Sequence, residues 1–320
     1  MTSIPVLRIL GGVFFLLAGI FYYYKIGFVF SFPILLVAAG AVVMVLALTK
    51  HRPTGGDIAL FVIGLLVFGG VSSVVTLTTG PSLSFGATTS QVHVHGLVVR
   101  LSSNFTSIRI TFSNRADLVY RLNFTGTPNF QLVPLKTNFF NETKDGVLFL
   151  DASSTASDIS MILGEGYSTN ITASAGAGSI YLATLGGEHL GRVSLSSGAG
   201  SINAVLPVAS IESLDISTGA GSIDLRSSHL VPTSPGTPVS LSSGAGSVSI
   251  NVSVPRAAGV EIAGSTGFGS ISNNLPGFSV TSSYGRISAT AGNLSQTNPS
   301  FRISVSTGAG SLNLEAHLIP

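Results

Sequence analysis

A seven-residue motif returns along the last two thirds of the chain at a nearly constant interval. It reads Ser-Ala-Gly-Ala-Gly-Ser-Ile up to Ile180 and Ser-Ser-Gly-Ala-Gly-Ser-Ile up to Ile202. From Ile180 onward the spacings are 22, 21, 25, 23, 16 and 25 residues, with later copies ending at Ile223, Val248, Ile271, Ile287 and Leu312. Degenerate copies end at Ile108 and Ile159, and a weak one lies around Phe130. These make about ten units, and such a period restricts the fold to repeat architectures.

Each unit has the pattern of strand, tight turn and strand. In Val193–Leu195 and again at 202–206, apolar residues alternate in part with small polar ones, as in a half-buried strand. Between these stretches, Gly198-Ala199-Gly200 forms a corner, and we expect Gly198 and Gly200 to adopt left-handed or similarly restricted backbone angles. Stacked corners would align the inward Ile and Leu side chains in ladders and let Ser and Thr hydroxyls hydrogen-bond along the stack.

The spacings predict an all-β domain built as a parallel β-solenoid (β-helix) of about ten rungs. A leucine-rich repeat would need an asparagine ladder, which is missing, and a propeller blade needs about 40 residues. An antiparallel sandwich with strands joined by glycine turns stays open as an alternative. We expect Glu315–Pro320 to cap the exposed sheet edge at the end of the stack, because its proline would block strand addition.

The first 80 residues are almost entirely apolar, and their charged residues are Arg8, Lys25, Lys50, Arg52 and Asp57. A helix needs about 20 residues to span a bilayer. Three apolar runs come close to this length or exceed it: Ile9–Tyr24, which Ile4–Leu7 extends, Ile26–Leu48 and Ile58–Leu77. We therefore expect a membrane domain of three transmembrane helices at 1–79 and an extracytoplasmic domain at 80–320.

The loops between these runs predict the orientation. Lys50 and Arg52 lie between the second and third runs and Arg8 lies near the start, whereas Lys25 is alone on the other side. Because cytoplasmic loops carry an excess of basic residues, the N-terminus is expected in the cytoplasm and the C-terminal domain outside the cell. A cleaved signal peptide is the alternative for the first run, but bulky Tyr22–Tyr24 and the missing A-x-A site disfavour it. The result is a multi-pass protein of the cell membrane, in contact with membrane lipid.

Charge and cysteine content exclude several classes of function. The net charge of the chain is +2, and beyond residue 80 the basic and acidic residues nearly cancel. A nearly neutral domain lacks the basic stripe that nucleic acid requires. The chain has no cysteine, so disulfides, thiolate catalysis and cysteine metal sites are excluded. We expect no cofactor.

Two stretches of the apolar region resemble the membrane region of LiaF-like proteins: Arg8-Ile-Leu-Gly-Gly-Val-Phe-Phe-Leu-Leu-Ala-Gly19 and Phe32-Pro-Ile-Leu-Leu-Val-Ala-Ala-Gly40. The repeated Ser-Thr-Gly-Ala-Gly-Ser-Ile motif resembles the β-helical ectodomains of the "putative adhesin" family, which are often joined to such regions. The solenoid likeness covers about two thirds of the chain. It implies a surface domain without catalytic residues. The LiaF likeness implies restraint of a sensor kinase during envelope stress, although that family typically has four membrane helices and this chain has three apolar runs.

His93 and His95 are the first candidates for a metal site. They lie two residues apart, which would place both imidazoles on one face of a strand. No third ligand is evident nearby, and we favour a polar face on the first strand that follows the apolar region. We therefore predict no metal site.

Two pairs of carboxylates flank turns of the repeat. Asp215 and Asp224 flank one turn, and Asp151 and Asp158 flank another. Glycoside hydrolysis needs such a pair. The acidic residues do not recur at equivalent positions of successive units, however, and no basic cluster accompanies them. The Gly-x-Gly turns also lack the strand–helix context and lysine of a phosphate-binding loop. We therefore predict that the chain is not an enzyme and has no catalytic residue.

Six asparagines begin Asn-x-Ser/Thr and are candidate N-glycosylation sites of a surface glycoprotein. They are Asn104, Asn123, Asn141, Asn170, Asn251 and Asn293. We expect Asn104 and Asn170 to be shielded in part because both adjoin strands.

The sequence thus favours a membrane-anchored cell-surface β-solenoid with a non-enzymatic structural or binding role of the adhesin type. Its expected partners are envelope glycans or surface proteins. The alternative is a LiaF-like envelope-stress regulator that acts on a membrane signalling partner. A carboxylate cleft would favour an enzyme instead.

Overall fold

The computed structural model describes residues 82–126, 136–292, 294 and 300–320, and all regular elements within them are β-strands. The all-β prediction is confirmed for this part of the chain. The three predicted membrane runs lie outside the described residues. Within those residues, the structure contains no helix with the length and apolar character of a membrane span.

The strands are β1 Ser82–Thr88, β2 Gly96–Ser103, β3 Ile108–Ser113, β4 Leu118–Gly126, β5 Thr137–Lys144, β6 Val147–Ser154, β7 Ser157–Gly164, β8 Ser168–Ala175, β9 Ile180–Ala183, β10 Glu188–Ala199, β11 Ile202–Val205, β12 Val208–Ala220, β13 Ile223–Ser227, β14 His229–Pro232, β15 Thr237–Ala245, β16 Val248–Pro255, β17 Gly259–Phe268, β18 Ile271–Asn274, β19 Ser279–Ser283, β20 Arg286–Ala291, β21 Ser300–Ala309 and β22 Leu312–Ile319.

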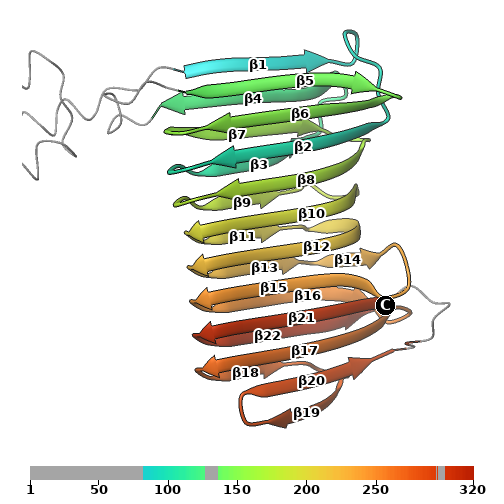
Figure 1. Cartoon of the computed structure of the whole chain (residues 1–320). Coiled ribbons are helices and arrows are strands. Elements are labelled where there is room, and N and C mark those ends of the chain that lie inside the picture. The colour runs from blue at the N-terminus through green and yellow to red at the C-terminus, as the bar shows by residue number, and fades with distance from the viewer. Residues whose placement is uncertain (1–81, 127–135, 293, 295–299) are drawn as a thin grey trace, which may run out of the picture. The chain divides into compact units, whose positions relative to one another are not determined.

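These strands form two sheets (Figure 1). Sheet A has ten strands in the order β1-β4-β7-β3-β9-β11-β13-β16-β22-β18. Sheet B has twelve, in the order β19-β20-β17-β21-β15-β12-β10-β8-β2-β6-β5, with β14 alongside β12. In the described residues, eight segments each supply one strand to sheet B and the next strand to sheet A: β2/β3, β6/β7, β8/β9, β10/β11, β12/β13, β15/β16, β17/β18 and β21/β22. Neighbouring units pair in parallel.

The order of these units in space departs from their order in the sequence at both ends. Strands β2 and β3 lie between the units β6/β7 and β8/β9, and β21 and β22 lie between β15/β16 and β17/β18. Val248 is therefore opposite Leu312, 64 residues away, instead of Ile271. The spacing of motif copies predicts that units pair in parallel, but any copy with a matching corner can occupy the neighbouring place.

Antiparallel pairs occur at three of the four sheet ends, so the sheets are mixed and the predicted ten parallel rungs are not confirmed. Strand β1 pairs antiparallel with β4, β5 with β6, and the β19–β20 hairpin with β17. The motif copy that ends at Ile287 belongs to this hairpin, where Ile287 lies opposite Gly264. Its 16-residue spacing from Ile271 is too short for the two long strands and two corners of a full unit.

The predicted C-terminal cap is wrong. Residues 312–319 form β22, which pairs with β16 on one side and β18 on the other and therefore lies inside sheet A. The segment that joins β18 of sheet A to β19 of sheet B carries Leu275, which is 8% exposed, and Phe278, which packs against the core. Those two side chains cover this end of the core.

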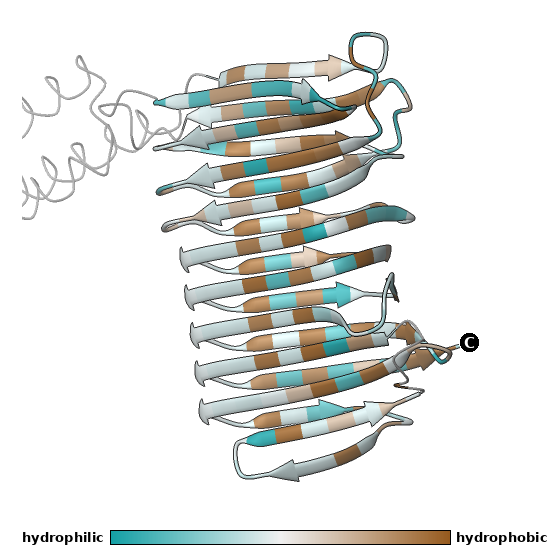
Figure 2. Cartoon of the chain, turned by 45° about the vertical axis from the view of Figure 1, so that its right-hand side comes forward, coloured by the Kyte–Doolittle hydropathy of each residue, from teal (hydrophilic) through white to brown (hydrophobic). Residues whose placement is uncertain are grey.

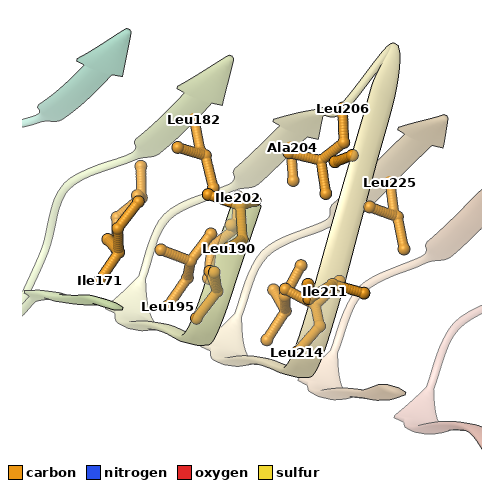
Figure 3. Close-up of a cluster of buried hydrophobic side chains, with 14 of the residues drawn as sticks. Ile171, Leu182, Leu190, Leu195, Ile202, Ala204, Leu206, Ile211, Leu214 and Leu225 are labelled. Atoms are coloured by element: carbon orange, nitrogen blue, oxygen red, sulfur yellow. The ribbon is translucent and has the colours of Figure 1, made fainter. Parts of the chain in front are cut away.

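The core lies between the two sheets, because each strand alternates inward apolar and outward polar residues (Figure 2). Ile180, Ile202 and Ile223, which end three successive motif copies, each begin a strand of sheet A and lie opposite one another in register. All three are 1% exposed. Side chains from both sheets, such as Leu182 and Leu195, point into the shared interior (Figure 3). The predicted apolar ladders are thus confirmed.

Candidate functional site

The second residue of the corner motif has a structural role in the stacking of the corners. The hydroxyl that precedes the first glycine is buried and donates to the carbonyl of the second glycine in the neighbouring corner. Thr218 donates to Gly200 O at 2.9 Å and Ser243 to Gly221 O at 2.9 Å. The same bond is made by Ser197 to Gly178, Thr307 to Gly246 and Thr266 to Gly310. Because these hydroxyls are used inside the fold, the second residue of the motif is not available to a partner.

The glycines of the corner are required mainly by close approach of neighbouring backbones. A Cβ on Gly198 would lie 2.5 Å from Gly176 O, and a Cβ on Gly200 would overlap Gly178 O. Neither Gly198 nor Gly200 has a positive φ, which corrects the predicted left-handed angles at these two positions. The expectation holds in the later corners, where Gly221 has a φ of +152°. In the earlier corners, steric exclusion of a Cβ is sufficient to require glycine.

The outer face of sheet B carries a continuous row of hydroxyls. Eight adjacent strands place a serine at the same register position, and the described pairings connect each serine to the next. We call this set the serine row: Ser153, Ser102, Ser174, Ser196, Ser217, Ser242, Ser306 and Ser265. Its members alternate with buried neighbours on each strand and so point outward. Strands in a sheet lie about 4.8 Å apart, so the hydroxyls repeat at that interval.

A second row runs parallel to the serine row, two residues earlier on each parallel strand. It contains Thr172, Ser194, Asp215, Ser240 and Ser304 on consecutive strands. Two residues of strand span about 6.6 Å. The two rows therefore form a regular grid of side chains that are short and mostly hydroxyl-bearing.

Charged side chains on this face are few and often neighbour an opposite charge. Arg100 lies opposite Asp151 on the adjacent strand. Arg302 Nε lies 3.2 Å from Glu261 Oε2. Both members of that pair are exposed to solvent, so the pair adds little stability. The outer face of sheet B is thus a hydroxyl surface with low net charge.

His93 and His95 do not lie on a strand. Both are exposed and belong to the segment between β1 and β2, where they line a hollow of about 620 Å³ together with Tyr167. Burial raises the pKa of Tyr167. The backbone of Gly146 packs against the His95 ring, because a Cβ on Gly146 would lie 2.6 Å from His95 Nδ1. In the described part of the chain, no three His, Cys, Asp or Glu side chains form a group that could hold a metal ion.

The candidate carboxylate pairs are divided between the sheets. Asp215 is on β12 of sheet B, whereas Asp224 is on β13 of sheet A and forms an ion pair with Arg226 at 2.7 Å. Asp151 is on sheet B, and Asp158 is on sheet A, where its Oδ1 accepts a hydrogen bond from Ser107 N at 3.0 Å. Because the members of each pair extend from different sheets, neither pair lines a shared cleft.

The asparagines of the candidate N-glycosylation sites differ in whether their side-chain amides form hydrogen bonds within the protein. Asn141 Nδ2 donates to the Tyr120 hydroxyl at 2.9 Å, and Asn251 Nδ2 donates to Glu315 Oε2 at 2.8 Å. Asn170 Oδ1 accepts from Arg192 N at 2.7 Å, although the residue is exposed. Asn104 is exposed at a corner, and Asn123 is half-buried in β4. Asn293 lies outside the described residues.

Sequence reasoning found the corner motif and expected stacked Ser and Thr hydroxyls, but it did not place a serine row on the outer face of sheet B. The signal was present as a serine just before each corner, in three units as Ser-x-Ser: Ser194-Leu-Ser196, Ser240-Leu-Ser242 and Ser304-Val-Ser306. The outward position of these serines follows from strand alternation. Their continuity across Ser102 and Ser306 depends on the strand order, which the sequence does not show.

No protein-family model and no curated protein matches the chain. Similar solved structures include a "putative cell adhesion protein" from Clostridium sporogenes, 16% identical with a TM-score of 0.42, covering 75% of this chain and 100% of that one. A "putative adhesin" from Bacteroides fragilis is 14% identical with a TM-score of 0.28, covering 73% and 96%. Another from Parabacteroides merdae is 12% identical with a TM-score of 0.26, covering 73% and 95%. Identities and TM-scores this low assign the chain to no family.

Proposed function

We propose that this chain is a non-enzymatic, adhesin-like binding protein of the cell surface, and that its contact surface is the outer face of sheet B. The observation that carries the proposal is the serine row, which places one hydroxyl on each of eight adjacent strands. Envelope glycans and surface proteins both offer the donors and acceptors that such a row can engage.

The face suits many modest contacts instead of one deep site. A single hydrogen bond contributes about 0.5–1.5 kcal/mol net, so affinity must come from several of them acting together. Serine has a short side chain and loses little rotamer freedom on binding compared with Lys, Arg or Gln. The strands that carry the row are fixed by ladders and by the buried corner hydroxyls, so the grid is preorganised for a partner with a repeating structure.

The absence of an enzyme activity is part of the same proposal. General acid–base hydrolysis of a glycoside needs two carboxyl groups about 5–10 Å apart on either side of the scissile bond. Asp215 and Asp224, like Asp151 and Asp158, extend from different sheets. That arrangement supports a binding role for the described surface.

The membrane anchor is proposed from the sequence. Residues 1–79 would form three transmembrane helices with the N-terminus in the cytoplasm, and the eight two-strand units would form a β-solenoid module outside the cell. The LiaF-like alternative, regulation of a membrane signalling partner, would use the faces of those helices.

A pull-down with the full chain from an envelope extract, beside a panel of immobilised polysaccharides, tests the proposal. We expect capture of a glycan or surface protein without turnover of any polysaccharide. Turnover that Asp215→Asn or Asp224→Asn abolishes would make the chain an enzyme and contradict the proposal.

A further inference from the structure

The outer face of sheet B ends in a hollow at the β19–β20 hairpin, which closes the lower end of the sheet in Figure 1. The hollow has a volume of about 350 Å³. That volume lies at the low end of the range of about 300–1,000 Å³ that is typical of small-molecule pockets. Its polar lining includes Ser265, Thr281, Ser283, Arg286, Ser288 and Ser304.

The hollow lies where a small residue takes the place of a longer side chain in the grid. Ala263 lies opposite Ser304 on β21 and opposite Ser288 on β20, at a position where the second row has a longer side chain on β12 and β8. Ser288 is in turn opposite Thr281 on β19. Ala263 therefore lines the hollow together with hydroxyls from β19, β20 and β21.

Arg286 extends the serine row by one strand. It lies opposite Ser265, the last member of the row, on one side and opposite Ser283 on the other. A second hollow of about 230 Å³ is also lined by Arg286 and Ser283. Arg286 thus lines both hollows, at the position where the motif copies of the regular corners carry only small residues.

Within the part of the chain that the structure describes, Arg286 has no carboxylate partner. Arg286 is the only charged residue in the lining of either hollow. Among the described residues it forms no ion pair, in contrast to Arg302, which contacts Glu261 on the same face. A guanidinium surrounded by hydroxyls and without a carboxylate partner matches an oxyanion, with which it forms charge-assisted and often bidentate hydrogen bonds.

We propose that the hollow over Ala263 binds an oxyanion of an acidic polysaccharide, with Arg286 holding the anionic group and the adjacent hydroxyls contacting the sugar ring. The inference rests on the proposed function, because the polymer would continue along the serine row. It adds the ligand class: a glycan that carries carboxylate or phosphate. Carboxylate and phosphate groups would be recognised by the same guanidinium and hydroxyl donors.

Three immobilised polymers test this inference with the purified full chain: polygalacturonate for carboxylate, poly(glycerol phosphate) for phosphate, and dextran as the neutral control. We expect binding to at least one acidic polymer and a loss of about tenfold or more in affinity for it in Arg286→Gln, the size of a lost charge-assisted bond. Arg286→Lys keeps the positive charge but loses the paired N–H donors of the guanidinium. Its affinity should lie between those of the wild type and Arg286→Gln. Arg302→Gln removes the same charge from the same face and is expected to bind like wild type.

The results separate this inference from the proposed function. Equal losses in Arg286→Gln and Arg302→Gln would show general electrostatic attraction and overturn the site. Binding to dextran as strong as to both acidic polymers would overturn the site but leave glycan binding intact. Failure to bind either acidic polymer would also overturn the site, while capture of a surface protein in the pull-down would preserve the proposed function. Circular dichroism of each variant confirms that the fold is unchanged.

Discussion

The Oγ1 of Thr218 donates a 2.9 Å hydrogen bond to the carbonyl oxygen of Gly200, 18 residues earlier and one unit away in the stack. Thr218 is only 5% exposed, so the bond joins two neighbouring corners within the protein interior. The same relationship recurs between Ser243 and Gly221. It explains why a hydroxyl precedes the first glycine in most copies of the motif, whereas the copy that ends at Ile180 has Ala175 at this position.

Replacing Thr218 with valine should destabilise the protein. The shape of the side chain is nearly kept, but the Gly200 carbonyl loses its side-chain hydrogen-bond donor, and leaving a buried polar group unsatisfied costs about 1–3 kcal/mol. Ser217→Ala, one residue away on the outer face, should change the free energy of unfolding by less than about 0.5 kcal/mol. Denaturant unfolding of both variants measures the difference. Equal stability of the two would contradict the role of the buried hydroxyl.

Replacing Gly198 with alanine tests the close approach of the corners. The added Cβ would lie 2.5 Å from Gly176 O, and the neighbouring corner would have to move. Overpacking of this kind costs about 1–3 kcal/mol. We expect a lower melting temperature and new protease cleavage around residues 176–223, whereas Ala199→Ser at the exposed centre of the same corner should behave like wild type. A stable, protease-resistant Gly198→Ala variant would show that the backbones are not packed this closely.

Replacing Glu188 should also lower the stability of the protein. Glu188 is 6% exposed, and its carboxylate accepts hydrogen bonds from Leu185 N and Gly186 N, both at 2.8 Å. Glu188→Gln replaces one acceptor oxygen with a donor and leaves one backbone N–H without its partner. We expect a loss of about 1–3 kcal/mol in the free energy of unfolding. Glu212→Gln, at an exposed position, is the matched control. A loss of similar size in both variants would indicate a general charge effect. It would contradict a specific role for the hydrogen bonds that Glu188 accepts from the backbone.

The proposed membrane topology can be tested with single cysteines, since the chain has none. Cysteines at Ser3 and Thr54 should be protected in intact cells, and one at Ser242 should react with a membrane-impermeant reagent. Labelling at all three positions after permeabilisation is the control. Labelling of Thr54→Cys in intact cells would exclude the arrangement of three spans.

The sequence predicts the local parts of this fold better than its connectivity. Strand alternation places Ile202 and Leu195 in the core, and the repeated glycines mark the corners, because these features depend on neighbours within one unit. The position of Leu312 beside Val248 depends on which distant copies fit together, and the spacing of the copies carries no such information. The hairpin that contains Ile287 was mistaken for a unit for the same reason.

On the candidate binding surface, too, the local features can be predicted from the sequence, whereas the features that depend on strand order cannot. Each Ser-x-Ser is visible in the sequence, and its outward direction follows from the pleat. The hollow over Ala263 depends on β20 and β21 lying on either side of β17. This arrangement brings Arg286 of β20 and Ser304 of β21 into the lining of one hollow. Pairing of this kind comes from tertiary structure alone, so Arg286 could be noticed in the sequence only as a departure from the motif.

The most direct test of the proposed contact surface compares two serines of one unit. Ser242 lies on β15 in the serine row of sheet B, and Ser249 lies on β16 of sheet A, seven residues later. Binding of the Ser242→Gln and Ser249→Gln variants to the captured partner is measured beside that of the wild type. We predict a loss of about tenfold, or 1.4 kcal/mol, for Ser242→Gln and no change for Ser249→Gln. A loss confined to Ser249→Gln, or no loss in either variant, would contradict the assignment of sheet B as the binding face.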